Sequence, residues 1–221
     1  MRWEDWEPLY REISDDFNYS REEDAKAAKI LNALLVNKRI CDDACIRNIV
    51  HKEVTVCGAA SNLREQLDAF GIAGTLIAAD NATSILLANG SLPDLIVTDL
   101  DGSVPEQIMA NAEGSVVVVH AHGDNIPALK EYVPHFSGLI AGTTQGRELG
   151  VVRNYGGFTD GDRAVFLARH FGAIRIRLLG FNFEEPAPKP GQDIAIKRKK
   201  LAWARRLIFD TDPEFAEIWM P

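Results

Sequence analysis

The chain has 221 residues, of which 46% are hydrophobic and 25% charged, and its formal net charge is -8 at pH 7. This length and hydrophobic content predict a packed core and exclude an extensively disordered chain. The negative charge argues against a general nucleic-acid-binding protein, which would present a basic surface. A nucleotide substrate is compatible with it, because substrate binding depends on the local field of the site.

The three cysteines are Cys41, Cys45 and Cys57. Such a small, odd number is typical of a reducing compartment rather than of a disulfide scaffold. Cys41 and Cys45 are four residues apart, as neighbours on one helix would be, and no second Cys or His pair follows at zinc spacing. No apolar run reaches the length of a membrane span, and the polar N-terminus does not resemble a signal peptide. We therefore expect a cytoplasmic protein that binds no membrane.

The chain divides into an N-terminal helical region, residues 1–50, and an α/β domain, residues 51–221. In the first region, apolar residues recur at helical spacing over residues 24–35. Ser20 followed by Glu23 has the spacing of a capping box at the start of this helix.

Beyond residue 53, short apolar runs alternate with helical patterns. The expected strands are residues 54–57, 74–78, 94–98, 115–120, 138–141 and 174–179. The expected helices are residues 62–70, 81–88, 105–112, 126–132, 163–171 and 193–209. This alternation predicts βα units that form a mainly parallel, Rossmann-like sheet with flanking helices. The proline-containing segment 184–191 is the one long loop that the pattern predicts.

Two carboxylates, Asp99 and Asp101, follow directly after the apolar run 94–98. In a parallel sheet, ligands sit beyond the carboxyl ends of the strands. Carboxylates at that edge suit a hard cation such as Mg2+, which proteins usually hold with one or two carboxylates plus substrate phosphates. The alternative is turn chemistry, because Asp is common in turns.

The next strand ends in His120, His122 and Asp124. Two histidines beside an aspartate suggest zinc, but the sequence offers no convincing third His or Cys ligand. We favour Asp124 as a further carboxylate of a Mg2+ or phosphate site, although Asp124 with Asn125 also suits a helix N-cap. At least one of the histidines is expected to contact a phosphate or to orient another group.

The ends of the first two expected strands carry further candidates. Gly58 allows a ligand to approach the backbone closely, and Ser61 is placed either to cap the next helix or to bind an anion at its N-terminus. Asp80 is placed either to cap a helix or to receive a hydroxyl or amide of a ligand. The sequence lacks the Gly-Lys-Ser/Thr of a Walker motif.

A glycine-rich loop, residues 156–163, precedes the late helix. Its two neighbouring glycines, two aspartates and one arginine favour a functional loop over a plain connector. Nucleophilic catalysis is not indicated, because the chain has no Gly-x-Ser-x-Gly elbow and no cysteine beside a plausible base.

The order of these motifs resembles two related families. Residues 79–102 resemble thiamin pyrophosphokinases, but Asn81 and Ala82 replace two glycines of that family and Gly102 replaces a serine. A closer resemblance is to the archaeal 6-hydroxymethyl-7,8-dihydropterin pyrophosphokinases, and it covers most of residues 53–209. The matching segments, in order, are Gly58–Ser61, Thr98–Gly102, His120–Asn125, Gly156–Arg163 and Lys197–Leu201. The first loop departs from the family, because Ala60-Ser61-Asn62 stands where Gly-Pro-Ser is common.

This resemblance implies Mg2+-dependent transfer of diphosphate from ATP to 6-hydroxymethyl-7,8-dihydropterin, with AMP as the other product, in tetrahydrofolate or tetrahydromethanopterin biosynthesis. The alternatives are a thiamin pyrophosphokinase and a non-catalytic or glycan-processing relative of the same fold. A homodimer is expected by analogy. The Lys197–Lys200 cluster is placed either to offset phosphate charge or to form a solvated helix face.

The resemblance also implies roles for individual residues. The expected metal ligands are Asp99, Asp101 and Asp124, with His122 as a further catalytic residue. The residues expected to bind ATP are Gly58, Ser61, Asn62, Asp80, Asn81 and His120. The residues expected to bind the pterin are Gly157, Asp160, Asp162 and Arg163, because a carboxylate there pairs with the guanidine-like edge of a pterin.

Overall fold

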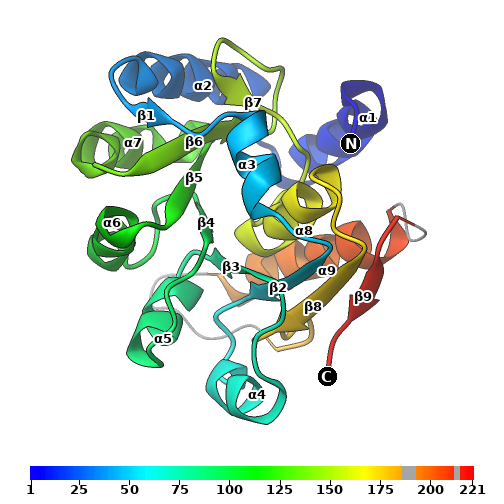
Figure 1. Cartoon of the computed structure of the whole chain (residues 1–221). Helices are drawn as coiled ribbons and strands as arrows, with labels where there is room; N and C mark the ends of the chain where they lie inside the picture. The colour runs from blue at the N-terminus through cyan, green and yellow to red at the C-terminus, as the bar shows by residue number, and fades with distance from the viewer. Residues whose placement is uncertain (186–192, 212–214) are drawn as a thin grey trace.

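A computed structural model describes residues 1–185, 193–211 and 215–221. Its centre is a nine-stranded sheet in the order β1-β6-β5-β4-β3-β2-β8-β9, with β7 beside β6. All pairings between these strands are parallel (Figure 1). The strands are β1 (Arg39–Ile40), β2 (Glu53–Cys57), β3 (Thr75–Ala79), β4 (Leu95–Thr98), β5 (Val116–Ala121), β6 (Leu139–Thr144), β7 (Val152–Arg153), β8 (Arg175–Leu179) and β9 (Glu217–Trp219).

Helices cover both faces of the sheet. The α-helices are α1 (Trp3–Phe17), α2 (Arg21–Leu35), α3 (Asp43–Ile49), α4 (Leu63–Phe70), α5 (Ala82–Ala88), α6 (Val104–Glu113), α7 (Ile126–Tyr132), α8 (Asp160–His170) and α9 (Ile194–Asp210). Two short 3-10 turns, η1 (Gly123–Asn125) and η2 (Val133–His135), flank α7. Because both faces are covered, the central strands are almost continuously apolar, as in β5, whose residues are all buried.

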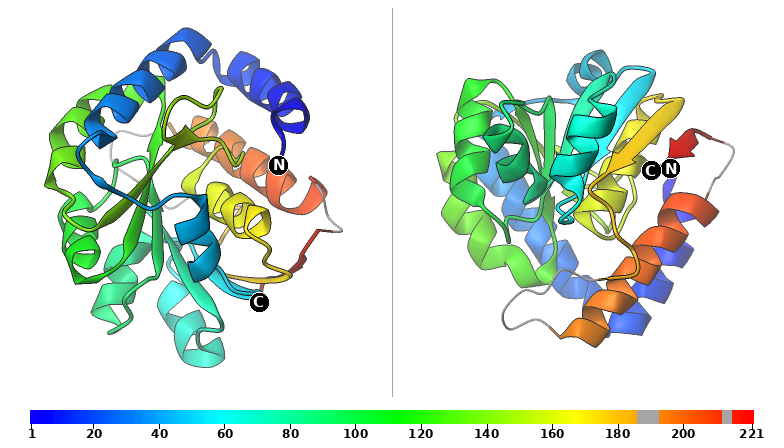
Figure 2. Two further views of the ribbon diagram at one scale, coloured as in Figure 1. Left: turned by 45° about the horizontal axis from the view of Figure 1, so that its top comes forward. Right: turned by 90° about the horizontal axis from the view of Figure 1, so that it is seen from below.

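Two hydrophobic cores lie on opposite sides of the sheet. Helices α2, α4, α5, α6 and α7 pack on one face, and α3, α8 and α9 pack on the other. A third cluster joins α1 to α8 and α9 through Trp6, Phe166 and Trp203. Figure 2 shows α1 and α9 side by side, and the Arg206–Glu12 ion pair of 2.7 Å links them.

The predicted α/β fold is confirmed. All six predicted strands are present as β2–β6 and β8, and the predicted helices are present as α2 and α4–α9. The strands β1, β7 and β9 escaped prediction because two or three residues are too few to show a pattern. The predicted loop 184–191 lies mostly outside the described residues. Within the described part of the chain, no helix is both long and apolar enough to cross a bilayer.

The N-terminal helices share the core of the sheet. Leu31 and Leu35 of α2 are fully buried, and a Cβ at Gly142 of β6 would lie 2.6 Å from Leu35 Cδ1. The strand β1 continues this contact, because it pairs with β6. Residue 50 therefore marks a change in the sequence pattern, whereas the core packing continues from the N-terminal helices into the sheet.

One expectation about the cysteines is wrong. Cys41 and Cys45 form a disulfide with a Cα–Cα separation of 5.2 Å, whereas Cys57 is free and buried. The pair does not lie on one helix, because Cys41 follows β1 and Asp42 caps α3 by accepting a hydrogen bond from the Cys45 N–H. The cap turns the chain back on itself at this point and brings the two sulfur atoms together.

The sheet has a topological switch point at β2. Strands β2 to β6 follow one another across the sheet in one direction, and β8 then lies on the opposite side of β2. In open α/β sheets, ligands bind outside the carboxyl ends of the strands near such a point. The predicted site residues lie in strand ends, loops and helix starts at this edge.

Candidate active site

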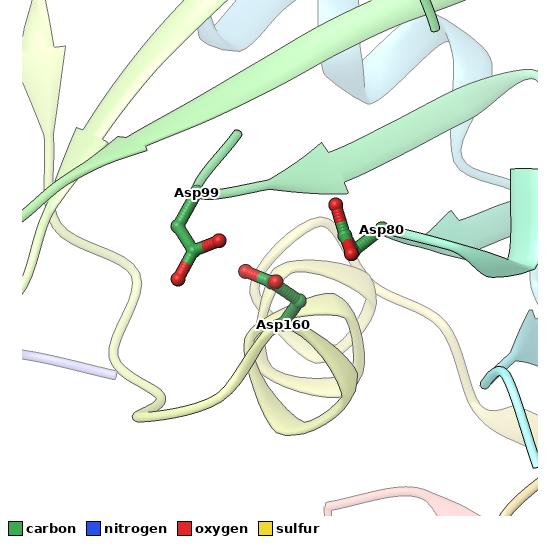
Figure 3. Close-up of side chains that lie close together, drawn as sticks. All are labelled: Asp80, Asp99 and Asp160. Carbon is green, nitrogen blue, oxygen red and sulfur yellow. The ribbon is translucent and has the colours of Figure 1, made fainter. Parts of the chain in front are cut away.

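Three carboxylates meet at the carboxyl edge of the sheet. Asp80 follows β3, Asp99 follows β4, and Asp160 is the first residue of α8. One carboxylate oxygen from each lies within 4.8 Å of the others. Figure 3 shows the three carboxyl groups pointing toward one another from two strand ends and one helix end. We call Asp80, Asp99 and Asp160 the acidic triad.

Asp80 is buried, and two neighbouring side chains donate hydrogen bonds to its carboxylate. Its Oδ1 accepts hydrogen bonds from Thr98 Oγ1 at 3.0 Å and Gln107 Nε2 at 2.9 Å. Its φ of 44° is in the left-handed region, which is uncommon for a non-glycine residue and recurs at functional sites. A Cβ at Gly102 would collide with the Asp80 carboxylate, so only glycine allows the Asp99–Gly102 loop to approach this closely. Burial, aided by the charges of Asp101 and Asp99, raises the pKa of Asp80 to about 6.

Asp99 is fixed by the loop that follows β5. Its Oδ2 lies 3.2 Å from His122 Nε2, and its backbone carbonyl accepts a 2.7 Å hydrogen bond from Asn125 Nδ2. The same Asn125 amide donates to the carbonyl of His120, which ties the ends of β4 and β5 together. Burial opposes ionisation of Asp99, but the hydrogen bond and charge of His122, with Arg163, outweigh it and lower its pKa to about 2.

Asp160 lies against Arg163, whose Nη1 is 3.1 Å from Asp160 Oδ1. Burial and the negative charge of Asp99 hold the pKa of Asp160 well above its usual range, and Arg163 offsets this only in part. Like charges that disfavour one another's ionisation are relieved by a bound cation. Because hard cations prefer carboxylate oxygens, the acidic triad fits Mg2+, with Asp80, Asp99 and Asp160 as the side chains that would hold it.

The loop before α8 is shaped by its glycines. Gly156 and Gly157 have φ values of 86° and 94°, and a Cβ at Gly157 would lie 2.6 Å from Arg163 Cα. Asp162 closes a capping box: its carboxylate accepts from the backbone N–H groups of Phe158 and Thr159 and, at 2.6 Å, from Thr159 Oγ1. The structure therefore gives Asp162 a capping contact where the sequence indicated a pterin contact.

A cavity of about 360 Å3 lies beside the triad. It extends from Asp99 and His122 to the corner where α1 and α2 meet. The other lining residues are Asn18, Tyr19, Ser20, Glu23, Asp24, Gly123, Asp124, Gln145, Phe158, Arg163 and Lys200. This volume lies within the range typical of small-molecule sites.

Asp24 is a residue of this site that the sequence analysis missed. It is buried and accepts hydrogen bonds from Tyr10 Oη at 2.7 Å, Gly123 N at 2.8 Å and Gln145 Nε2 at 2.7 Å. These contacts join α1, α2, β6 and the loop that carries His122. The signal that would have revealed it is its position on the apolar face of α2, in helical register with Leu31, because a carboxylate there must find buried partners.

Two predicted metal ligands lie outside the triad. Asp101 is exposed, and its backbone N–H donates to Asp99 Oδ1 at 3.3 Å. Asp124 is exposed at the rim of the cavity. The difference arises partly at Leu100, whose φ of 67° turns the chain between Asp99 and Asp101. Asp80 and Asp160, predicted to bind ATP and pterin, take their place beside Asp99.

His120 lies beneath the site. Its ring is buried, with Nδ1 3.1 Å from the Thr143 hydroxyl, which itself donates to the Val119 carbonyl. Nδ1 therefore carries the hydrogen, and Nε2 has no hydrogen-bond partner in the described part of the chain. Burial, with the charges of Arg163 and His122, holds the pKa of His120 well below its ordinary value, so the ring is neutral. A phosphate contact of His120 stays a prediction, and in this structure the ring is buried.

The remaining residues predicted to bind ATP lie around β2 and β3. Gly58 packs so closely on the turn after β8 that a Cβ would lie 2.6 Å from the Gly180 carbonyl oxygen. Ser61 is exposed, and Asn62 begins α4 with its Oδ1 buried and unpartnered among residues 1–185, 193–211 and 215–221. Asn81 Oδ1 accepts from Ser103 N at 2.9 Å. The sequence offered helix capping as the alternative role of Ser61 and Asp80. In the described part of the chain, neither α4 nor α5 has a side-chain hydrogen bond that caps its N-terminus.

Comparison with known proteins assigns this chain to a family. Residues 28–187 match the family described as 6-hydroxymethylpterin diphosphokinase MptE-like. A protein of Pyrococcus furiosus named 6-hydroxymethyl-7,8-dihydropterin pyrophosphokinase is 42% identical over 220 residues, which cover 94% of this chain and 93% of that protein. A protein of Methanothermobacter thermautotrophicus with the same name is 43% identical, over 92% of each chain.

A solved structure of a MAf glycosyltransferase from Magnetospirillum magneticum AMB-1 has a similar fold. It superposes with a TM-score of 0.53 and 15% sequence identity, over 88% of this chain and 36% of that longer chain. At this identity the similarity shows a shared fold and carries no argument about activity.

Proposed function

Since the chain belongs to the MptE-like 6-hydroxymethylpterin diphosphokinase family, we propose that it transfers diphosphate from ATP to 6-hydroxymethyl-7,8-dihydropterin and releases AMP. The product would feed tetrahydrofolate or tetrahydromethanopterin biosynthesis. The observation that carries this proposal is the acidic triad, which stands at the carboxyl edge of the sheet beside a cavity of suitable size.

The reaction joins the hydroxymethyl oxygen of the acceptor to the β-phosphorus of ATP and breaks the bond between that phosphorus and the oxygen that leaves with AMP. Catalysis of this kind consists mostly of positioning and charge neutralisation. Mg2+ bound at Asp80, Asp99 and Asp160 would offset the phosphate charge and polarise the transferred group. The side chains of the triad come from rigid strand and helix ends, so their separation is fixed before substrates bind.

His122 is the side chain best placed to handle the hydroxyl proton. Its Nε2 faces a carboxylate oxygen of Asp99, so Nε2 carries a hydrogen, and Nδ1 is the acceptor that faces the backbone N–H of Asn125 in a capping box. The ring lines the cavity beside the triad. His122 would accept the proton of the attacking hydroxymethyl group once Nδ1 leaves the Asn125 contact, while Asp99 holds the ring at Nε2.

Arg163 adds a fixed positive charge next to the triad. Its guanidinium contacts Asp160, and the residue also lines the cavity. A guanidinium in this position would stabilise charge that develops on the transferred phosphates.

Product analysis tests this proposal. The purified protein is incubated with ATP, Mg2+ and 6-hydroxymethyl-7,8-dihydropterin, and the spent nucleotide is separated by chromatography. The expected products are AMP and the pterin diphosphate, with no turnover in excess EDTA. A parallel incubation with thiamin tests the other acceptor predicted from the sequence. ADP as the main nucleotide product, or diphosphate transfer to thiamin alone, would contradict the proposal.

A further inference from the structure

We propose that the cavity under the α1–α2 corner is the site of the pterin ring, with Tyr19 and Phe158 as its aromatic walls and the nucleotide on the opposite side of the acidic triad. This inference rests on the proposed function and assigns the acceptor ring to two aromatic side chains that were not among the expected pterin-binding residues.

Two aromatic side chains that line the cavity pack against a third. Tyr19 comes from the link between α1 and α2, and Phe158 comes from the loop before α8; their ring centroids are 6.3 Å apart and their planes are tilted by 49°. Phe17 lies behind both rings, stacked on Tyr19 at 5.5 Å and 5.1 Å from Phe158. Two rings supported by a third offer a firm apolar surface to a flat ligand.

Lys200 of α9 completes this wall. Its Nζ lies 5.8 Å from the Tyr19 ring centroid and 5.9 Å from that of Phe158. The neighbouring Lys199 instead pairs with Asp16 at 3.0 Å. Of these two lysines, Lys200 lines the cavity, where an ammonium suits the carbonyl oxygen of a pterin ring.

Polar groups of the cavity match a pterin in chemistry. Glu23 and Asp124 are among the lining residues, and the Glu23 carboxylate also pairs with Lys26 at 3.1 Å. The aminopyrimidinone edge of a pterin presents neighbouring N–H donors, for which a carboxylate is the strongest acceptor among side chains. A ring bound here is therefore held by stacking on its face and by charge-assisted hydrogen bonds at its edge.

The position of the cavity gives the ring its orientation. Its lining includes Asp99, which contacts His122, and Tyr19, whose ring centroid lies 5.8 Å from Lys200 Nζ. Phe158 lies in the loop directly before Asp160, the first residue of α8, so the wall of the cavity and the triad are close in sequence. A hydroxymethyl group at the Asp99 end would face the triad directly.

The sheet order places the nucleotide elsewhere. The cavity lies over the ends of β4, β5 and β6, whereas the switch point lies at β2 and β8, where the turns at Gly58 and Gly180 pack together. The triad stands between these two regions, because it is built at the ends of β3 and β4. Two substrates that approach the triad from opposite sides can react in line.

Separate titrations of the two substrates test the assignment. The pterin is titrated without ATP, and Mg2+ with a non-hydrolysable ATP analogue is titrated without pterin, by calorimetry. The variants are Tyr19→Leu and Phe158→Leu, and Phe70→Leu on α4 is the matched control, since Phe70 is 45% exposed and lies outside the cavity. We expect the pterin Kd to rise at least about tenfold in both cavity variants, equivalent to about 1.4 kcal/mol. The affinity for the ATP analogue should equal that of the wild type, and the control should bind both ligands normally.

Thermal unfolding of each variant shows whether the protein is folded. If the buried Phe158→Leu variant fails to fold, Tyr19→Leu still tests the ring site. Unchanged pterin affinity in folded variants of an active wild type would overturn the ring site and leave the proposed function standing. Loss of affinity for the ATP analogue in place of pterin would assign the cavity to the adenine ring and also overturn it. A wild-type protein that neither binds nor converts the pterin would overturn the proposed function itself.

Discussion

The carboxylate of Asp24, on an N-terminal helix, accepts a 2.8 Å hydrogen bond from the backbone N–H of Gly123, next to the catalytic candidate His122. The approach is close, because a Cβ at Gly123 would lie 2.7 Å from the Cβ of Glu23. Since His122 contacts Asp99, the helix α2 holds the loop that positions one member of the acidic triad. The N-terminal region is thus part of the site.

Replacing Asp24 by Ala should destabilise the protein and slow turnover. Three buried donors, from Tyr10, Gly123 and Gln145, would lose their acceptor, and each unsatisfied group costs about 1–3 kcal/mol. We expect the free energy of unfolding to fall by roughly 2–5 kcal/mol, measured by urea denaturation. The control is Asp15→Ala, an exposed aspartate of α1. Equal stability of the two variants would show that the Asp24 contacts are not needed.

Amide substitutions within the triad should abolish turnover. Asp99→Asn and Asp160→Asn each remove a carboxylate that would hold Mg2+, and we expect losses of about 10²–10³-fold or more in kcat. Asp101→Asn is the matched control and should lose far less, because its side chain lies outside the triad. The opposite ranking, in steady-state assays at saturating Mg2+, would restore the metal ligands that the sequence predicted.

Asp80→Asn should stabilise the metal-free protein at neutral pH. The pKa of Asp80 is near 4 in the unfolded chain and is raised to about 6 in the folded protein. Between these two pH values the folded state binds more protons than the unfolded state, so the free energy of unfolding falls as the pH rises. Above pH 6 the full cost of the charge is present, on the order of 2–3 kcal/mol. An Asn keeps the Oδ1 that accepts from Thr98 and Gln107.

The measurement is thermal unfolding of both proteins in EDTA at pH 5 and pH 7.5. The Tm advantage of Asp80→Asn should be larger at pH 7.5, and saturating Mg2+ should reduce it by stabilising the wild type. A variant that is less stable than the wild type at both pH values would contradict the idea that charge repulsion strains the triad.

Asp160 and Asp162 should have different roles, one in metal binding and one in helix capping. Asp162→Ala removes the capping box of α8, and loss of such a cap costs about 0.5–2 kcal/mol of stability. Asp160→Ala should instead weaken Mg2+ binding, because that carboxylate belongs to the triad. Calorimetric titration of Mg2+ into both variants, together with thermal unfolding, checks this division. Loss of Mg2+ binding in Asp162→Ala with unchanged stability would reverse it.

Several predictions stay open. The expected homodimer, the cytoplasmic location and the pathway that is fed stay predictions.

Much of the fold and part of the site follow from the sequence alone. Apolar runs bounded by turn residues identify the central strands, because a strand covered on both faces must be apolar throughout. Their parallel arrangement then places Asp80 and Asp99 at one edge of the sheet. Both residues were recognised as site candidates, since polar residues after buried strands have a clear local signal.

The composition of the triad and its cavity was decided only by tertiary structure. Asp160 reaches Asp80 and Asp99 because α8 packs against β2, β3 and β4 and begins beside the triad, and nothing in its neighbouring residues specifies that packing. Asp101 leaves the group through the left-handed turn at Leu100, and Asp24 joins the site only where α2 meets the loop after β5. Local patterns fix which residues end a strand or cap a helix, whereas contacts between distant segments depend on how the whole core packs.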